Sequence, residues 1–168
     1  RGESTPVAYL VGRKEFYSLS FEVTPDVLIP RPETEHLVVA LLDRAKEHAT
    51  DEPLRIADVG TGSGILAVCA ATHLPTASIT AIDISAPALA VARSNASSHA
   101  VADRIDFVEG DLLSSVESPR SFDFILSNPP YLAESELADL DADVREHEPR
   151  AALIAGGRST QVIERLIP

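Results

Sequence analysis

The sequence predicts an α/β fold in which helices cover both faces of a parallel β-sheet. Apolar segments of strand length alternate along the chain with segments of helical spacing, a pattern typical of parallel sheets. A glycine-rich turn at 60–64 joins one of these strands to the next helix, as in α/β proteins that bind nucleotides. The connections between the strands should therefore cross over in the right-handed sense.

The elements are expected in a regular order that begins with a hairpin. Residues 14–23 are rich in aromatic side chains and alternate around two serines, which predicts a short β-hairpin. Three prolines between 25 and 32 exclude a helix before Glu33, after which the leucines show helical spacing. Ser85 is a suitable N-cap for an alanine-rich helix. Strands are expected at 55–59, 78–83, 105–108 and 122–126, and helices at 65–73, 86–99 and 160–167.

The expected order ends on a helix, which would leave one edge of an open sheet uncovered. An uncovered edge exposes unpaired backbone groups, so we expect further strands after the helix at 160–167. We divide the sequence into two parts. Residues 1–32 form an N-terminal linker and hairpin segment, and residues 33–168 form a ligand-binding α/β domain that is incomplete at its C-terminal end.

Composition narrows the class of protein. The chain carries 14 Lys and Arg against 26 Asp and Glu, a net charge of -12 without any basic run, which argues against nucleic acid as a partner. Cys69 has no second cysteine to pair with, which favours a reducing compartment. The longest apolar stretch, 65–71, is too short to span a bilayer, and no signal peptide is visible. We therefore expect a cytoplasmic monomer without a membrane partner. The five histidines are scattered along the chain, so we expect no metal site.

The glycine turn and three acidic residues predict a nucleoside-binding crevice. Asp58 precedes the turn, which reads Gly60-Thr61-Gly62-Ser63-Gly64, and glycine there lets a ligand approach the backbone. Asp83 ends the next expected strand, where a carboxylate can accept the hydroxyls of a ribose. Asp111 follows the third strand. The glycines alone could form a tight turn and Asp83 alone could be a local cap, but their joint occurrence favours ligand binding.

A second motif, Asn128-Pro129-Pro130-Tyr131, follows the fourth expected strand and so lies at the same edge of the sheet. The Asn128 side-chain carbonyl can accept one N–H, and the Pro129 carbonyl can accept another without a competing donor. Tyr131 adds a flat face. Two hydrogen-bond acceptors and a flat aromatic ring suit a planar NH₂ group on an sp² carbon, as in a carboxamide or an aminopurine. By itself the motif could merely end a strand; after this glycine turn we interpret it as a catalytic motif that orients such a nitrogen for attack on a methyl carbon.

The spacing G-x-G-x-G, with Ile65 where a dinucleotide fingerprint has its third glycine, resembles the first motif of class I S-adenosylmethionine methyltransferases. Together with 28–35 (LIPRPETE) and 128–131, the sequence resembles the HemK/PrmC family of protein-(glutamine-N5) methyltransferases. The likeness extends to 8–12, 15–17 and 148–153, which is nearly the whole chain. This family methylates the glutamine of the Gly-Gly-Gln motif in class 1 peptide chain release factors.

The resemblance implies a Rossmann-like class I methyltransferase domain over 33–168, S-adenosylmethionine as cofactor and a class 1 release factor as partner. The family also has an N-terminal helical domain and three more strands than this sequence contains. By the resemblance, cofactor-binding residues are Asp58, Gly60, Thr61, Gly62, Ser63, Gly64, Asp83, Asp111, Leu112 and Asn128. Catalytic residues are Asn128, Pro129 and Tyr131, and substrate-binding residues are these three with Pro130, Arg31 and Glu33.

Other functions stay open at this point. A methyltransferase for the exocyclic amine of adenine or guanine shares the motif at 128–131 but would need a basic groove. A methyltransferase that acts on a ribosomal protein glutamine usually carries a different sequence after the proline-arginine pair, which is Pro30-Arg31 here. A dinucleotide oxidoreductase would use the same strand, turn and helix with a different glycine spacing. A non-catalytic binding fragment is the remaining alternative.

Overall fold

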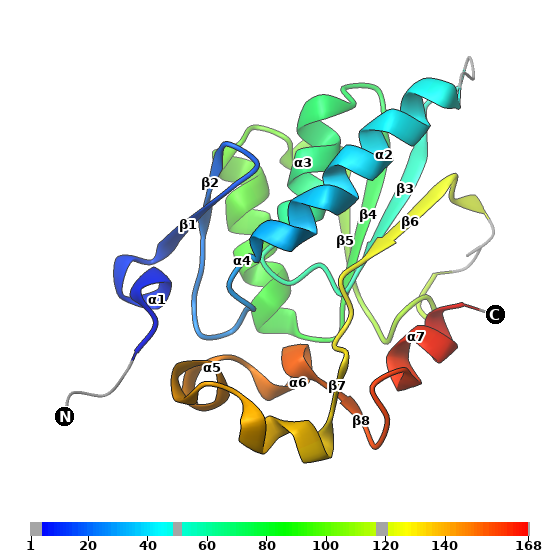
Figure 1. The fold of residues 1–168 in the computed structure, drawn as a ribbon. Coiled ribbons are helices and arrows are strands. Elements are labelled where there is room, and N and C mark those ends of the chain that lie inside the picture. Colours follow the sequence, from blue (N-terminus) through cyan, green and yellow to red (C-terminus); the bar gives the residue numbers. More distant parts are fainter. Residues whose placement is uncertain (1–4, 49–51, 117–120, 168) are drawn as a thin grey trace.

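The computed structural model describes residues 5–48, 52–116 and 121–167, so the outermost ends of the two expected domains, 1–4 and 168, lie outside it. A four-stranded parallel sheet with the order β5-β4-β3-β6 forms its centre (Figure 1). This sheet and the hairpin before it confirm the predicted α/β fold class. The strands are β3 (Arg55–Val59), β4 (Ser78–Asp83), β5 (Ile105–Glu109) and β6 (Phe124–Ser127).

Three helices cover one face of the sheet (Figure 1). They are α2 (Glu35–Glu47), α3 (Ile65–His73) and α4 (Ala86–Ser98). Side chains alternate between the faces of a strand, and Ile56, Ile79 and Leu126 all point into this helical layer. Seven consecutive residues of α3, 65–71, are buried. The helix is apolar on all sides because it lies between the sheet and its two neighbouring helices.

The opposite face of the sheet is covered less completely. Ala57, Val59 and Ile82 pack there against a group of partly buried side chains. This group comprises Val108, Leu112, Leu113, Val116, Phe122 and, from α7 (Gln161–Leu166), Leu166. Ile125 of β6 points to the same face and remains 44% exposed. Within the described residues, α7 is therefore the only helix in the cluster on this face.

The predicted hairpin forms from β1 (Arg13–Phe16) and β2 (Leu19–Glu22). Its two-residue turn has positive φ at Tyr17 and Ser18, 49° and 60°, as the twist of a tight hairpin requires. Phe16 and Phe21 are fully buried in edge-to-face contact, with ring centroids 6.2 Å apart. The hairpin is therefore part of the main core. The short helix before it, α1 (Val7–Val11), was not predicted.

Several short elements after β6 cross below the carboxyl ends of the strands (Figure 1). They are β7 (Leu132–Ala133), the 3-10 helix η4 (Glu134–Asp139), α5 (Ala142–His147), α6 (Arg150–Leu153) and β8 (Ile154–Gly156). β7 and β8 pair in parallel as a separate two-stranded sheet. None of these five elements was predicted from the sequence. In the part of the chain after β6, only the final helix, at 160–167, was expected. Further 3-10 turns are η1 (Pro32–Thr34), which makes α2 begin at Glu35 rather than Glu33, and η2 (Ala102–Arg104).

The hairpin's place in the core gives a stability prediction. Phe21→Ala should lower the free energy of unfolding by about 3–5 kcal/mol, the usual effect of deleting a buried aromatic ring. Urea denaturation measures this free energy, and Leu10→Ala is the control. Leu10 is 72% exposed, so removal of its side chain should change stability by about 0.5 kcal/mol at most. Equal effects of the two substitutions would show that the hairpin does not belong to the cooperative core.

Candidate active site

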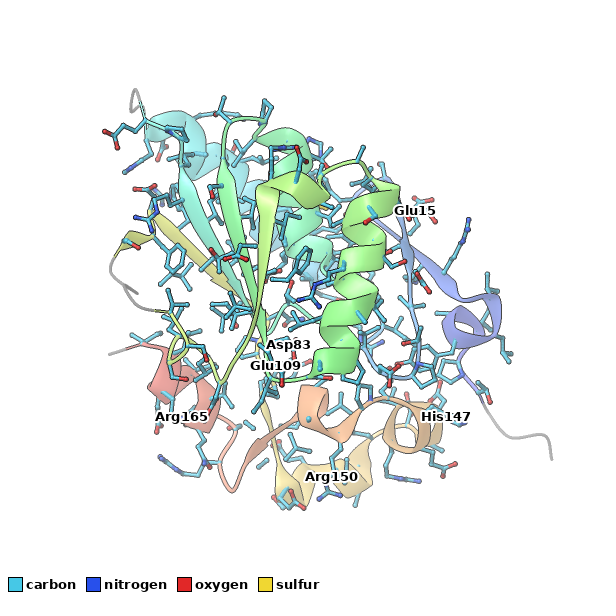
Figure 2. All side chains as sticks on the ribbon, turned by 180° about the vertical axis from the view of Figure 1, so that it is seen from behind. Glu15, Asp83, Glu109, His147, Arg150 and Arg165 are labelled. Atoms are coloured by element: carbon cyan, nitrogen blue, oxygen red, sulfur yellow. The ribbon has the colours of Figure 1, made fainter. Side chains whose placement is uncertain are left out.

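The carboxyl ends of the parallel strands meet at one edge of the sheet, and the predicted site residues follow them there. The glycine turn follows β3, Asp83 ends β4, Asp111 follows β5 and Asn128 follows β6. Figure 2 shows Asp83 beside Glu109 at this edge. A first cavity of about 360 Å³ opens there. Its lining includes Arg31, Asp58, Gly60, Thr61, Gly62, Ser63, Asp83, Asp111, Leu112, Asn128 and Pro130.

Backbone hydrogen bonds hold the glycine turn in place. The N–H groups of Gly60 and Thr61 both donate to the Ile82 carbonyl, at 2.8 and 3.0 Å. The N–H of Gly62 donates to Asp83 Oδ2 at 2.8 Å. These donors are therefore not available to a ligand, whereas the pyrophosphate of a dinucleotide is bound by N–H groups of this kind. The turn is suited to a nucleoside ligand without phosphates.

The three glycines have different surroundings, although φ is positive at each of them (73°, 54° and 81°). A Cβ added at Gly60 or Gly62 would meet no atom within 4 Å, so a ligand can approach the backbone there. A Cβ at Gly64 would lie 3.0 Å from the Cβ of Ala92 in α4. The first two glycines leave room in the cavity, whereas Gly64, which is outside its lining, lets the turn pack against α4.

Asp58 brings an unpaired acceptor to the first cavity. Its side chain is buried, and Oδ2 accepts hydrogen bonds from Thr61 Oγ1 at 2.6 Å and the Ala67 N–H at 3.0 Å. Oδ1 has no partner among the described residues. Burial raises the pKa of the Asp58 carboxyl to about 6, although the two hydrogen bonds oppose this shift. A ligand that donates a hydrogen bond to Oδ1 would satisfy a buried acceptor that is otherwise costly.

A second cavity of about 380 Å³ adjoins the first and is lined by the expected substrate residues except Pro130, which lines the first cavity instead. Its lining includes Arg31, Glu33, Thr34, Asn128, Pro129 and Tyr131. Asn128 and Thr34 line both cavities, so they stand where the two meet. Asn128 Nδ2 donates to Thr34 Oγ1 at 3.4 Å, which leaves the Asn128 side-chain carbonyl to accept from a ligand. Tyr131 is 60% exposed and lies at the rim.

Arg31 forms a wall shared by the two cavities. Its Nη2 donates to Glu148 Oε1 at 2.6 Å, and the Glu148 side chain is only 1% exposed. The backbone N–H of Ile29 donates to the other oxygen of the same carboxylate at 3.3 Å. Glu148 thus fastens the segment before α2 to the segment after α5. Arg31 was predicted from the sequence to bind substrate, and the structure gives it this structural partner in addition.

Asp111 has a partner that the sequence did not reveal. Its Oδ2 accepts a hydrogen bond from Arg165 of α7 at 2.5 Å, so the carboxylate is already paired at the edge of the first cavity. Leu112, which follows it, has a positive φ of 55°. Both residues line the cavity as expected, but part of the hydrogen-bonding capacity of Asp111 is used by α7.

Four residues near the site were given no role by the sequence analysis: Thr34, Glu148, Arg165 and Asn95, whose side chain donates to the Ser63 carbonyl of the glycine turn at 2.8 Å. Asn95 alone left a usable signal, because asparagine is a poor helix former and this one lies inside an alanine-rich helix. Thr34 and Glu148 lie in the segments 28–35 and 148–153 that carry the family resemblance, but nothing in their residue types indicates their partners, and Arg165 is an ordinary polar residue of the expected helix at 160–167. Their partners are 94, 117 and 54 positions away along the chain, distances over which no local pattern operates.

The parallel sheet, the glycine turn and the two adjoining cavities are together characteristic of a methyltransferase domain. The model of the methyltransferase small domain family matches residues 35–168, and the chain belongs to this family.

Individual relatives confirm the more specific resemblance. The release factor glutamine methyltransferase of Rhodopirellula baltica is 47% identical over 168 residues, which cover 99% of this chain and 57% of the relative. The release factor glutamine methyltransferase of Bacillus subtilis is 43% identical over 167 residues, which cover 98% of this chain and 57% of the relative. The chain thus spans somewhat more than half the length of these relatives.

Solved structures confirm the fold. The hMettl16 catalytic domain in complex with the MAT2A 3'UTR hairpin 1 superposes with a TM-score of 0.69. The alignment covers 91% of this chain and 56% of that one at 19% identity, so it demonstrates a shared fold alone. In the described residues, no helix has the length and apolar character to cross a bilayer.

The different surroundings of the glycines lead to a paired prediction. Gly64→Ala should lower the free energy of unfolding by about 2–4 kcal/mol, because the left-handed backbone is unfavourable for alanine and the added methyl overlaps Ala92. Gly60→Ala should lower it by only about 1–2 kcal/mol, since the backbone effect acts there alone. Urea denaturation of both variants measures the difference, and equal losses would contradict the close approach of Gly64 to α4.

The raised pKa of Asp58 predicts a pH dependence of stability. The group titrates near 3.8 when unfolded and near 6 when folded, so the folded state binds the extra proton between these values. The contribution of Asp58 to stability is therefore greatest at low pH, falls as pH rises from about 4 to 6, and stays low above that range. Asp58→Asn should remove this fall and match or exceed wild-type stability at pH 7.5. Thermal unfolding from pH 4 to 8 tests it, and parallel curves for the two proteins would contradict it.

Proposed function

We propose that this domain transfers a methyl group from S-adenosylmethionine to the side-chain nitrogen of the glutamine in the Gly-Gly-Gln motif of a class 1 release factor. The observation that carries the proposal is the position of Asn128, which lines both cavities with its side-chain carbonyl free to accept. The relatives from Rhodopirellula baltica and Bacillus subtilis are release factor glutamine methyltransferases, which supports the choice of substrate. The domain responsible is 33–168, with 1–32 as its N-terminal linker and hairpin segment.

The first cavity suits the cofactor. Gly60 and Gly62 leave open space beside the backbone, and Asp58 offers an unpaired carboxylate oxygen. Asp83 stands at the end of β4, where it can accept ribose hydroxyls, and the engaged N–H groups of the turn disfavour a cofactor with phosphates. S-adenosylmethionine, when bound, supplies a methyl group on a positively charged sulfur. Asp58, Gly60, Thr61, Gly62, Ser63, Asp83, Asp111, Leu112 and Asn128 would hold it.

The second cavity suits the glutamine. A carboxamide nitrogen is a poor nucleophile because its lone pair is delocalised into the carbonyl. The side-chain carbonyl of Asn128 and the backbone carbonyl of Pro129 would each accept one amide hydrogen, and Tyr131 would cover the flat face of the group. These acceptors orient the nitrogen and stabilise the positive charge that develops on it. The proton can leave late, so the chain needs no strong base at this position.

The acidic character of the domain weighs against the alternative substrates in nucleic acid. An exocyclic amine of adenine or guanine would present the same NH₂ group to Asn128. The net charge of -12 would oppose the approach of a phosphate backbone to this site. A monomeric, cytoplasmic enzyme acting on a protein remains our expectation.

Mass spectrometry of a class 1 release factor tests this function. We expect one added methyl on the Gly-Gly-Gln glutamine after incubation with the enzyme and S-adenosylmethionine. Asn128→Ala should slow the reaction by about 10²–10³-fold, as when one preorganised group that stabilises developing charge is removed. Ser98→Ala, a change at the exposed last residue of α4 outside both cavities, is the control.

Two results would count against the proposal. Methylation by Asn128→Ala at the wild-type rate would remove the role of Asn128. No added methyl on the release factor, with S-adenosylhomocysteine binding intact, would move the assignment to another amide or to a nucleobase amine.

A further inference from the structure

Asn95 connects three parts of the structure through its side-chain amide. It lies inside α4 and is 1% exposed, and its amide nitrogen and oxygen together make three hydrogen bonds. Two go to the backbone of Glu22 at the end of the hairpin, and one goes to the carbonyl of Ser63 in the glycine turn. A buried asparagine with every partner in place can fix the geometry of the segments that it joins.

We propose that Asn95 is a positioning residue for the cofactor turn and that the hairpin sets the orientation of its amide. The inference rests on the proposed function, because it concerns the site assigned there to S-adenosylmethionine. It assigns a functional role to the hairpin as well as to Asn95.

The hairpin determines which way the amide faces. Asn95 Oδ1 accepts from the Glu22 N–H at 2.7 Å, and Nδ2 donates to the Glu22 carbonyl at 3.0 Å. The side chain therefore pairs with Glu22 as a neighbouring strand would. If the amide were flipped, its NH₂ would face the Glu22 N–H and its oxygen would face the Glu22 carbonyl. The flip is therefore unfavourable, and Nδ2 stays on the side of the glycine turn.

The second hydrogen of Nδ2 holds the turn. It is donated to the Ser63 carbonyl at 2.8 Å. That carbonyl belongs to the peptide plane between Ser63 and Gly64, and the Gly64 N–H in the same plane donates to the Thr61 carbonyl at 2.8 Å. Both ends of this plane are thus fixed. Because Ser63 lines the first cavity, the position of the plane sets part of the surface that the cofactor meets.

Asn95 restrains the glycine turn from the helical side, whereas the turn's other anchors lie in the sheet. The turn's bonds to Ile82 and Asp83 come from the end of β4, within the sheet. The bond to Asn95 comes from the helical layer, and α4 lies between the sheet and the hairpin (Figure 2). Ser94, the preceding residue, also contacts the hairpin: its Oγ donates to Glu22 Oε2 at 2.6 Å. Ser94 is exposed and is not a cavity residue, which makes it a matched control.

Calorimetric titration with S-adenosylhomocysteine tests the inference in wild type, Asn95→Ala, Asn95→Asp and Ser94→Ala, each well below its unfolding temperature. Both Asn95 variants should bind about tenfold more weakly, whereas Ser94→Ala should bind as wild type does. In steady-state assays the KM for S-adenosylmethionine should rise, with kcat and the KM for the release factor unchanged. Aspartate places a carboxylate oxygen against two carbonyls, and protonation restores one donor. The ratio of Asn95→Asp affinity to wild-type affinity should therefore recover as pH falls.

A second measurement needs no variant. In wild-type protein, hydrogen exchange of the Asn95 side-chain amide should slow when S-adenosylhomocysteine binds. Wild-type affinity in both Asn95 variants, or unchanged exchange of this amide on binding, would overturn the inference while leaving the proposed function intact. If wild-type protein bound no S-adenosylhomocysteine, the proposed function would fail first, and the positioning role with it.

Discussion

The bonds from the glycine turn to the end of β4 are the constraint on which the site depends. The Ile82 carbonyl accepts from two consecutive N–H groups of the turn, and Asp83 accepts from a third. Because β3 and β4 are adjacent parallel strands, these bonds fix the turn at the height where both strands end. The open space beside the first two glycines, the buried acceptor of Asp58 and the packing of Gly64 on α4 all follow from that position. The hydrogen bonds that hold the turn are thus all made to partners within the protein.

The site lowers the stability of the folded protein at Asp58. A buried carboxylate with one unpaired oxygen is unfavourable in the free protein, as the raised pKa of Asp58 shows. The apolar strands and α3 around Asp58 increase this cost, and the burial of their own side chains in the core offsets it. Unfavourable groups of this kind concentrate at functional sites.

The sequence was informative where structure is local and repetitive. The strands at 55–59 and 78–83 and the helix at 65–73 have the predicted bounds, because each is an apolar segment with turn residues beside it, such as the glycine turn before the helix and Pro75 after it. The segment 132–156 was missed because its pieces are two to six residues long and depend on contacts with distant segments. At the site, glycine spacing and strand ends could be read directly. The partners of Asn128, Arg31 and Asp111 could not, since each pairing is decided by the folded arrangement.

The contact between Arg31 and Glu148 gives the glycine turn and the wall shared by the two cavities different origins in the chain. The glycine turn and its anchors on β4 lie within 58–83, so this part of the first cavity can form from a short continuous segment. The shared wall joins residues 117 positions apart, and closing so long a loop carries a larger entropic penalty. A partly folded chain would thus possess the turn before it possessed the wall. Completion of this wall, which lines both cavities, therefore reports that the segments before α2 and after α5 have come together.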